Sequence, residues 1–166
     1  MAHLCLSNSL LIRGNDFTQN AQVNQIIDDP KNHCLLLYPT ANSIDISNRK
    51  VIQENRQLLF PENKNVVLFV IDGTWSTAKK TLRLSVNLKK LQAIHFSPEK
   101  PSHFRVRKQP RPQCYSTIES IHHVIELFDA SSQKSAPINR PQDVLLTVFS
   151  HMVEQQIGFI PTTKVK

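Results

Sequence analysis

The residues best placed to do chemistry follow the most hydrophobic segment of the chain. Residues 66–71 form an uninterrupted run of six apolar side chains, and Asp72-Gly73-Thr74-Trp75 comes directly after it. A carboxylate at that point can accept a proton, and Gly73 lets a ligand come close to the backbone. Thr74 can offer a hydroxyl, and Trp75 a flat face for stacking. Spacing alone leaves a second interpretation equally open, in which Asp72 caps the next helix and Trp75 lies in the core.

A second set of residues that could contact a ligand lies at the end of another apolar run. Residues 33–38 are largely apolar and stop at Pro39, so that Tyr38-Pro39-Thr40 follows a predicted strand. In an open α/β sheet, ligands bind in the crevice beyond the carboxyl ends of the strands. We therefore expect both groups to contribute to one ligand site.

The positive charge of the chain is concentrated in one segment. Residues 79–111 contain ten basic residues and one acid, Glu99, whereas the whole chain carries a net charge of +7. Clustered Lys and Arg favour a polyanion partner, because neutralising phosphates releases counterions. The alternative is a solvated face with a basic loop. A membrane surface fits less well, since the basic residues are interleaved with prolines rather than laid along an amphipathic helix.

Composition excludes several common classes. Three widely spaced cysteines form neither a disulfide framework nor a CxxC zinc ribbon, and they suit a reducing cytosol. Three glycines cannot supply GxGxxG or a P-loop, which excludes the Rossmann fingerprint and Walker-type nucleotide binding. No apolar run approaches the roughly 20 residues of a membrane span, and the start lacks a basic n-region. We expect a cytoplasmic protein that does not bind membranes.

Strands alternate with helices along the chain. The runs 33–38 and 66–71 do not alternate in polarity, which predicts strands buried on both faces of a parallel sheet. Residues 93–96 are a weaker candidate strand, and residues 9–13 a short one. Because strands and helices alternate, the class is α/β, with one domain over residues 1–166.

Four helices are expected. The first covers residues 18–28, and the second covers 75–84 with Trp75, Ala78 and Leu82 inward. Ser116-x-x-Glu119 is a capping box that opens the third. The last begins near Pro141, and Gly158 is expected at the C′ position just beyond its end. Apolar stripes are predicted on the third helix at Ile118, Ile121, Ile125 and Phe128, and on the last at Leu145, Phe149, Met152 and Val153. Residues 100–112 are an extended loop, and residues 131–139 a polar linker.

The ordered motifs resemble a known family. Asp72-Gly73-Thr74-Trp75, followed by Ala78-Lys79-Lys80, is similar to the D-x-T-W signature of the DTW-domain family, within the TDD superfamily. Tyr38-Pro39 upstream and Tyr115-Ser116-Thr117-Ile118-Glu119 downstream continue the resemblance, with Tyr115 where the family's L-S-T-x-E element has Leu. A further match is Ser102-His103-Phe104-Arg105-Val106-Arg107-Lys108-Gln109-Pro110. Together these motifs cover roughly residues 9–157.

The resemblance implies a fold and an activity. The fold is a SPOUT-like knotted α/β structure, with a mostly parallel sheet and helices on both faces. The activity is transfer of the 3-amino-3-carboxypropyl group from S-adenosylmethionine to the ring imide nitrogen of a tRNA uridine, with release of methylthioadenosine. Family members usually carry an N-terminal cysteine cluster for zinc, then a strand and an N-T-G element. The resemblance here starts after them, so we expect an N-terminally short domain. SPOUT-type folds often form dimers, but the DTW branch does not do so reliably, and we expect a monomer.

Two other functions stay open. The chain could be a non-catalytic remnant that binds RNA or S-adenosylmethionine, or a knotted RNA methyltransferase. Transfer of labelled methyl or carboxypropyl groups to tRNA separates these possibilities.

The residue types and the resemblance together suggest roles for individual residues. We expect Asp72 to be the catalytic base or to orient the uracil. Loops around the strand ends and the capping box are expected to bind the cofactor through Tyr38, Pro39, Thr40, Gly73, Thr74, Trp75, Ser116 and Thr117. Basic residues are expected to contact RNA, first Arg105, Arg107 and Lys108, then Lys79 and Lys80. One of the arginines could instead clamp the cofactor carboxylate.

No metal ligand set is expected. His122 and His123 are adjacent, so on a helix their side chains point about 100° apart. Neither these residues nor His151 belongs to a Cys or Asp pattern that completes a ligand set. Glu119 is interpreted as the capping-box partner of Ser116 rather than as a catalytic acid.

Overall fold

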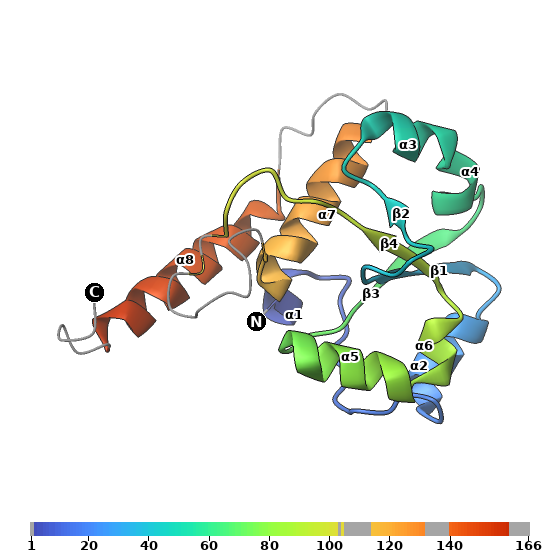
Figure 1. Ribbon diagram of the computed structural model, residues 1–166, viewed down its shortest axis with the longest axis horizontal. Helices are drawn as coiled ribbons and strands as arrows, with labels where there is room; N and C mark the ends of the chain where they lie inside the picture. The colour runs from blue at the N-terminus through green and yellow to red at the C-terminus, as the bar shows by residue number, and fades with distance from the viewer. Residues whose placement is uncertain (1, 103, 105–113, 132–139, 160–166) are drawn as a thin grey trace. The chain divides into compact units, whose positions relative to one another are not determined.

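The computed structural model describes residues 2–102, 104, 114–131 and 140–159 (Figure 1). The chain divides into two compact units. We call Leu11–Phe96 the sheet unit, and Met1–Leu10 together with Ser97–Lys166 the helical unit. Most of the predicted loop at 100–112 and nearly all of the predicted linker at 131–139 lie outside the described residues.

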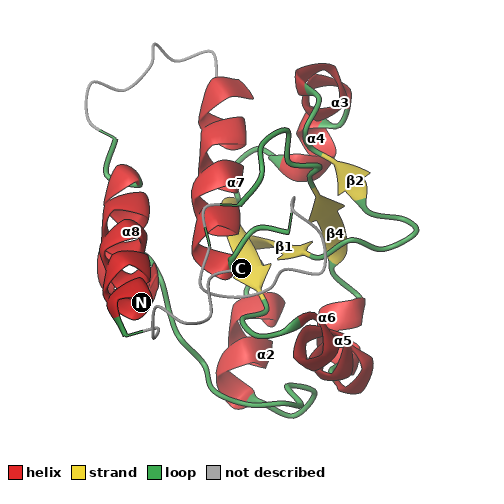
Figure 2. Cartoon of the chain, turned by 60° about the vertical axis from the view of Figure 1, so that its left-hand side comes forward, coloured by secondary structure: helices red, strands yellow, loops and turns green. Residues whose placement is uncertain are grey.

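The sheet unit contains four strands, and every pairing between them is parallel (Figure 2). Their order is β2-β4-β1-β3. The bounds are β1 Asn32–Leu37, β2 Ile44–Asp45, β3 Asn65–Val70 and β4 Gln92–His95. The predicted α/β class and parallel sheet are confirmed, and three predicted strands lie within one residue of the observed bounds. The two-residue strand β2 was not predicted, because it is too short to show a pattern.

The prediction that β3 is buried on both faces is wrong. β3 is an edge strand of the described sheet, and its first two residues are exposed while the rest are half-buried. By contrast, Leu35 and Leu36 of β1 point to opposite faces of the sheet and are 0% and 1% exposed. Both strands have the same apolar composition, so composition alone does not tell an edge strand from a central one.

Three helices cover one face of the sheet by packing on Leu36. They are α2 (Ala21–Asp28), α5 (Trp75–Leu84) and α6 (Val86–Lys89), which contribute Val23, Leu82 and Leu88 to a common core cluster. In Figures 1 and 2 the strands run between these helices and the pair α3 (Arg49–Glu54) and α4 (Arg56–Leu59). The predicted bounds of α5 are confirmed. α2 begins three residues later than predicted, because Asn20 caps it by accepting a hydrogen bond from the Val23 amide at 3.0 Å.

The prediction of a strand at residues 9–13 is wrong. This segment has no regular secondary structure, and Leu10 and Leu11 are more than half exposed. A strand needs a pairing partner as well as β-favouring residues. A short apolar run therefore gives too little information to predict one.

The helical unit contains α1 (Ala2–Cys5), α7 (Thr117–Ser131) and α8 (Asp143–Gly158). The predicted apolar stripe of α8 is largely confirmed, because Leu145, Phe149 and Val153 are buried and Met152 is half-buried. On α7, all four predicted positions are only half-buried, whereas Val124 is 1% exposed. Gly158 is the last helical residue and Phe159 is the C-cap, so Gly158 does not follow the helix as predicted. None of the described helices combines the length and the hydrophobicity that crossing a membrane requires.

Candidate active site at the carboxyl edge of the sheet

The strand register places the predicted groups at one edge of the sheet. Leu37, the last residue of β1, pairs with Val70 on one side and with Ile94 on the other. Because all strands are parallel, the residues that follow them emerge at the same edge. The structure therefore brings together the two segments singled out by the sequence, residues 38–40 after β1 and residues 72–75 after β3.

Gly73 makes the turn from β3 into α5 possible. Its φ angle is +146°, a conformation that residues with a side chain rarely adopt. A Cβ atom added here would lie 3.2 Å from Cγ2 of Thr77. Glycine at this position is thus required by the backbone path that leads from the strand end into the helix.

Thr74, not Asp72, caps α5. Its Oγ1 accepts a hydrogen bond from the Thr77 amide at 3.1 Å and lies 2.9 Å from the hydroxyls of both Ser76 and Thr77. The interpretation of Asp72 as the helix cap is therefore wrong. Asp72 is exposed to solvent at the strand end.

Trp75 is not a core residue. It is the first residue of α5 and is 48% exposed, which overturns the expectation that it points inward. Its ring centroid lies 6.4 Å from that of Tyr38, with the rings tilted by 58°. The ends of two neighbouring strands thus carry a partly exposed aromatic pair, and one member follows Asp72 by three residues. Such a pair offers a surface on which a flat heterocycle can stack.

A cationic face on α5 extends away from this pair. Lys79, Lys80 and Arg83 are exposed and share one side of the helix by their spacing. On α6, the Lys89 ammonium group donates to the Arg83 carbonyl oxygen at 3.0 Å. No acidic residue occurs between Trp75 and Lys90. The three basic residues thus lie on the solvent-exposed side of α5.

The remaining predicted residues belong to the helical unit. The Ser116 amide donates to the Glu119 carboxylate at 2.8 Å, and the Glu119 amide donates to Ser116 Oγ at 3.3 Å. This is the predicted capping box, and Thr117 is the first residue of the helix it opens. Glu119 is 4% exposed, and its Oε2 also accepts a hydrogen bond from the Ser102 hydroxyl. Arg105, Arg107 and Lys108 lie outside the described residues.

A histidine at the same sheet edge was not predicted from the sequence. His95 ends β4, and its ring lies between Ser43 and Asp45, two residues of the chain that follows β1. A single histidine next to an apolar segment has no motif around it. The signal that could have found it is its position, since a polar residue at the carboxyl end of a predicted strand faces the ligand edge.

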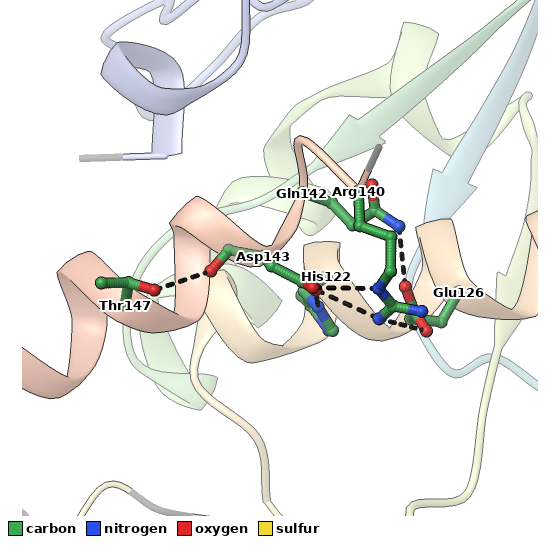
Figure 3. A network of polar contacts seen from close by, with 6 residues as sticks. All are labelled: His122, Glu126, Arg140, Gln142, Asp143 and Thr147. Atoms are coloured by element: carbon green, nitrogen blue, oxygen red, sulfur yellow. Dashed lines mark hydrogen bonds and ion pairs between the residues drawn. The ribbon is translucent and has the colours of Figure 1, made fainter. Parts of the chain in front are cut away.

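A polar network joins α7 to the start of α8 (Figure 3). Arg140 donates to both carboxylate oxygens of Asp143, at 2.9 and 3.1 Å, and forms an ion pair with Glu126 at 2.8 Å. His122 Nε2 lies 3.0 Å from Asp143 Oδ1. Gln142, which is 4% exposed, donates to the other oxygen of Glu126.

Hydrogen bonds and charges within this network shift the pKa values of its ionisable side chains. Hydrogen bonds from Arg140, and then from His122, lower the pKa of Asp143 from 3.8 to about 2. Burial opposes ionisation of Glu126, but the hydrogen bonds from Gln142 and Arg140 outweigh it, and the pKa of that carboxyl is lowered. The pKa of Arg140 is raised, first by Asp143 and then by Glu126.

Three of these residues also have the composition of a metal site. Ligand atoms of His122, Glu126 and Asp143 all lie within 4.8 Å of one another. Arg140 already bridges the two carboxylates, so a metal ion would have to displace a guanidinium group. We interpret the cluster as an ion-pair network. The sequence contained part of this signal, since Glu126 follows His122 by four residues on one helix face.

The fold and the edge residues together define an α/β protein with a candidate ligand site at the ends of its parallel strands. Residues 1–157 match the DTW domain, and the chain belongs to the DTW-domain family. Over 126 residues the chain is 27% identical to tRNA-uridine aminocarboxypropyltransferase 2 of Drosophila melanogaster. The match covers 76% of this chain and 45% of the relative, so the chain spans less than half the length of that protein. No solved structure matches the chain.

Proposed function

We propose that the chain transfers the 3-amino-3-carboxypropyl group of S-adenosylmethionine to the ring imide nitrogen of a tRNA uridine, releasing methylthioadenosine. The observation that carries the proposal is an exposed carboxylate, Asp72, at a sheet edge shared with the Tyr38–Trp75 pair, in a chain of the DTW-domain family. The name of the Drosophila relative supports the same reaction. The proposal includes a SPOUT-like knot, one domain over residues 1–166, and a monomer that acts in the cytoplasm.

The residues at the edge fit the donor molecule chemically. Tyr38 and Trp75 offer aromatic surface to adenine, and backbone near Pro39, Thr40, Gly73 and Thr74 offers amides and carbonyls without a glycine-rich loop. Ser116 and Thr117 are included because the resemblance assigns them to the cofactor. When bound, S-adenosylmethionine supplies an electrophilic carbon next to its sulfonium.

Asp72 is assigned two tasks in this reaction. Its carboxylate accepts the imide proton of the uridine while the ring nitrogen forms its new bond to carbon. It also orients the uracil, so that the carboxypropyl carbon rather than the methyl group lies in line for attack. The exposure of Asp72 supports both tasks, because a carboxylate sealed in the core could not reach a substrate.

Cationic side chains are proposed to hold the tRNA. Lys79 and Lys80 stand on the exposed face of α5, and this helix starts with the aromatic residue of the proposed site. Phosphate contacts position an RNA without specifying its sequence. Arg105, Arg107 and Lys108 are assigned to the same task on the basis of the sequence, or one of the arginines to the cofactor carboxylate.

Two labels on the donor test the proposed function. The purified chain is incubated with tRNA and with S-adenosylmethionine labelled separately in the methyl group and in the carboxypropyl group. Carboxypropyl label that stays with the tRNA supports the proposal. Methyl label on the tRNA would instead identify a methyltransferase. Tight tRNA binding with neither label would identify a non-catalytic binding protein.

A further inference from the structure

The segment after β1 crosses the carboxyl end of β4. Leu37 pairs with Ile94 from one side of β4, and Ile44 pairs with the same residue from the other side. Residues 38–43 must therefore pass over the end of β4, where His95 is the last residue of the strand. This crossing loop begins with Tyr38, Pro39 and Thr40, which the proposed function assigns to the cofactor.

The hydroxyl group of one serine makes several hydrogen bonds within this loop and to β4. Ser43 Oγ donates a hydrogen bond to the Thr40 carbonyl oxygen at 2.7 Å and accepts one from the Thr40 amide at 2.9 Å. The same oxygen lies 2.9 Å from His95 Nδ1. A serine hydroxyl has a single proton and two lone pairs. A carbonyl oxygen can only accept, so its 2.7 Å contact assigns the hydroxyl proton to that bond, and the contact with His95 then requires a proton on Nδ1.

The other side of the imidazole ring faces a carboxylate. His95 Nε2 lies 3.8 Å from Asp45 Oδ2, and His95 and Asp45 are register partners on adjacent strands. Oδ1 of Asp45 accepts a hydrogen bond from the Ser47 amide at 2.9 Å. With Nδ1 protonated, Nε2 either carries a lone pair or, in the imidazolium form, faces the negative charge of Asp45. The bond from Nδ1 to Ser43 is present in both forms.

With its protons placed in this way, the Ser43–His95–Asp45 group differs from a hydrolytic triad. In such a triad the serine hydroxyl gives its proton to histidine. Here Ser43 gives its proton to a backbone carbonyl and accepts from two N–H groups, so its oxygen has no lone pair left for attack.

We propose that His95 is a positioning residue for the cofactor loop, which it holds across the end of β4 by donating from Nδ1 to Ser43. This role rests on the proposed function insofar as Tyr38, Pro39 and Thr40 bind S-adenosylmethionine. His95 acts through Ser43 and the Thr40 backbone, so its loss affects donor affinity rather than proton transfer.

Two substitutions of His95 by residues with a side-chain amide test whether His95 positions the loop through its hydrogen bond to Ser43 or only fills space. The side-chain amide of His95→Asn overlaps the Nδ1 position and can still donate to Ser43, whereas that of His95→Gln overlaps Nε2 and faces Asp45. We expect the Asn variant to bind S-adenosylmethionine like the wild type. The Gln variant and Ser43→Ala should bind it roughly two- to tenfold more weakly, the range for one neutral hydrogen bond. Equal affinity of the Asn and Gln variants, with unfolding curves like that of the wild type, would overturn the role.

The imidazole nitrogens of the unliganded full chain provide a readout that does not depend on activity. A ¹⁵N spectrum of the His95 ring should show a protonated Nδ1. The Thr40 amide should exchange slowly in the wild type and in the Asn variant, and faster in the Gln variant. An Nε2-protonated neutral ring would overturn the proposed hydrogen bond. If the wild type bound no S-adenosylmethionine while Nδ1 carried the proton, the cofactor site would be wrong, and His95 would position a loop without that function.

Discussion

The backbone conformation of Gly73 allows the turn from β3 into α5 at the candidate site. Replacement by alanine forces a side chain into a φ of +146° and brings its Cβ against Thr77. Strained residues of this kind cost on the order of 1–3 kcal/mol. We expect Gly73→Ala to lower the free energy of unfolding by that amount and to weaken donor binding, as denaturant titration and calorimetry can measure. Alanine at Gly158, where no atom lies within 4 Å of the added Cβ, is the matched control. Equal stability of the two variants would contradict this account.

At the residue scale, the sequence predicted where candidate site residues lie in the fold better than it predicted what each side chain contacts. The strand end made Asp72 a candidate, and the structure leaves that carboxylate exposed as the candidate role requires. The burial of Trp75 was predicted wrongly from its helical spacing, which shows only which residues share a helix face. Trp75 is the first residue of the helix, where the buried face is incomplete, so the spacing does not determine its exposure. His95 was missed because its significance comes from Ser43, 52 residues earlier in the chain.

At the element scale, α5 carries two of the candidate RNA contacts. Changing Lys79 and Lys80 together to Gln should weaken tRNA binding and flatten its dependence on salt concentration. The slope of log K against log salt should fall by about 1 for each phosphate that the variant no longer neutralises. The double change of Arg105 and Arg107 to Ala should act in the same way. Changing Arg49 and Lys50 on α3 to Gln removes as much charge and is the control. A slope that changes as much in the control as on α5 would contradict the assignment.

The longer elements were predictable, whereas the short helices α1, α3, α4 and α6 and the neighbours of each strand were not. Apolar runs bounded by Pro39 and by Asp72-Gly73 indicated the ends of β1 and β3 because local residues set those ends. The edge position of β3 depends on which strands pair with it, and this is a property of the assembled sheet. The capping box was predicted in full, since all its partners lie within four residues.

At the scale of the whole molecule, acid should destabilise the helical unit through Asp143. Its folded-state pKa of about 2 lies below the ordinary 3.8, so the ionised form is favoured by folding. The resulting stability is fully present above about pH 4 and is lost as the pH falls towards 2. Asp143→Asn should therefore show a weaker loss of stability across this window than the wild type, measured by amide exchange in α7 and α8. Identical acid profiles would count against the network shown in Figure 3.

The most direct test of the central claim is donor-group transfer by the Asp72→Asn variant, which keeps the shape of the side chain and removes the base. The measurement compares carboxypropyl label transferred to tRNA by the variant and by the wild type, with S-adenosylmethionine affinity measured in parallel. Removing a general base costs typically about 10²–10⁴-fold in rate. We predict a loss of that size with donor affinity largely unchanged. Transfer by the variant at close to the wild-type rate would contradict the proposal that Asp72 takes the uridine proton.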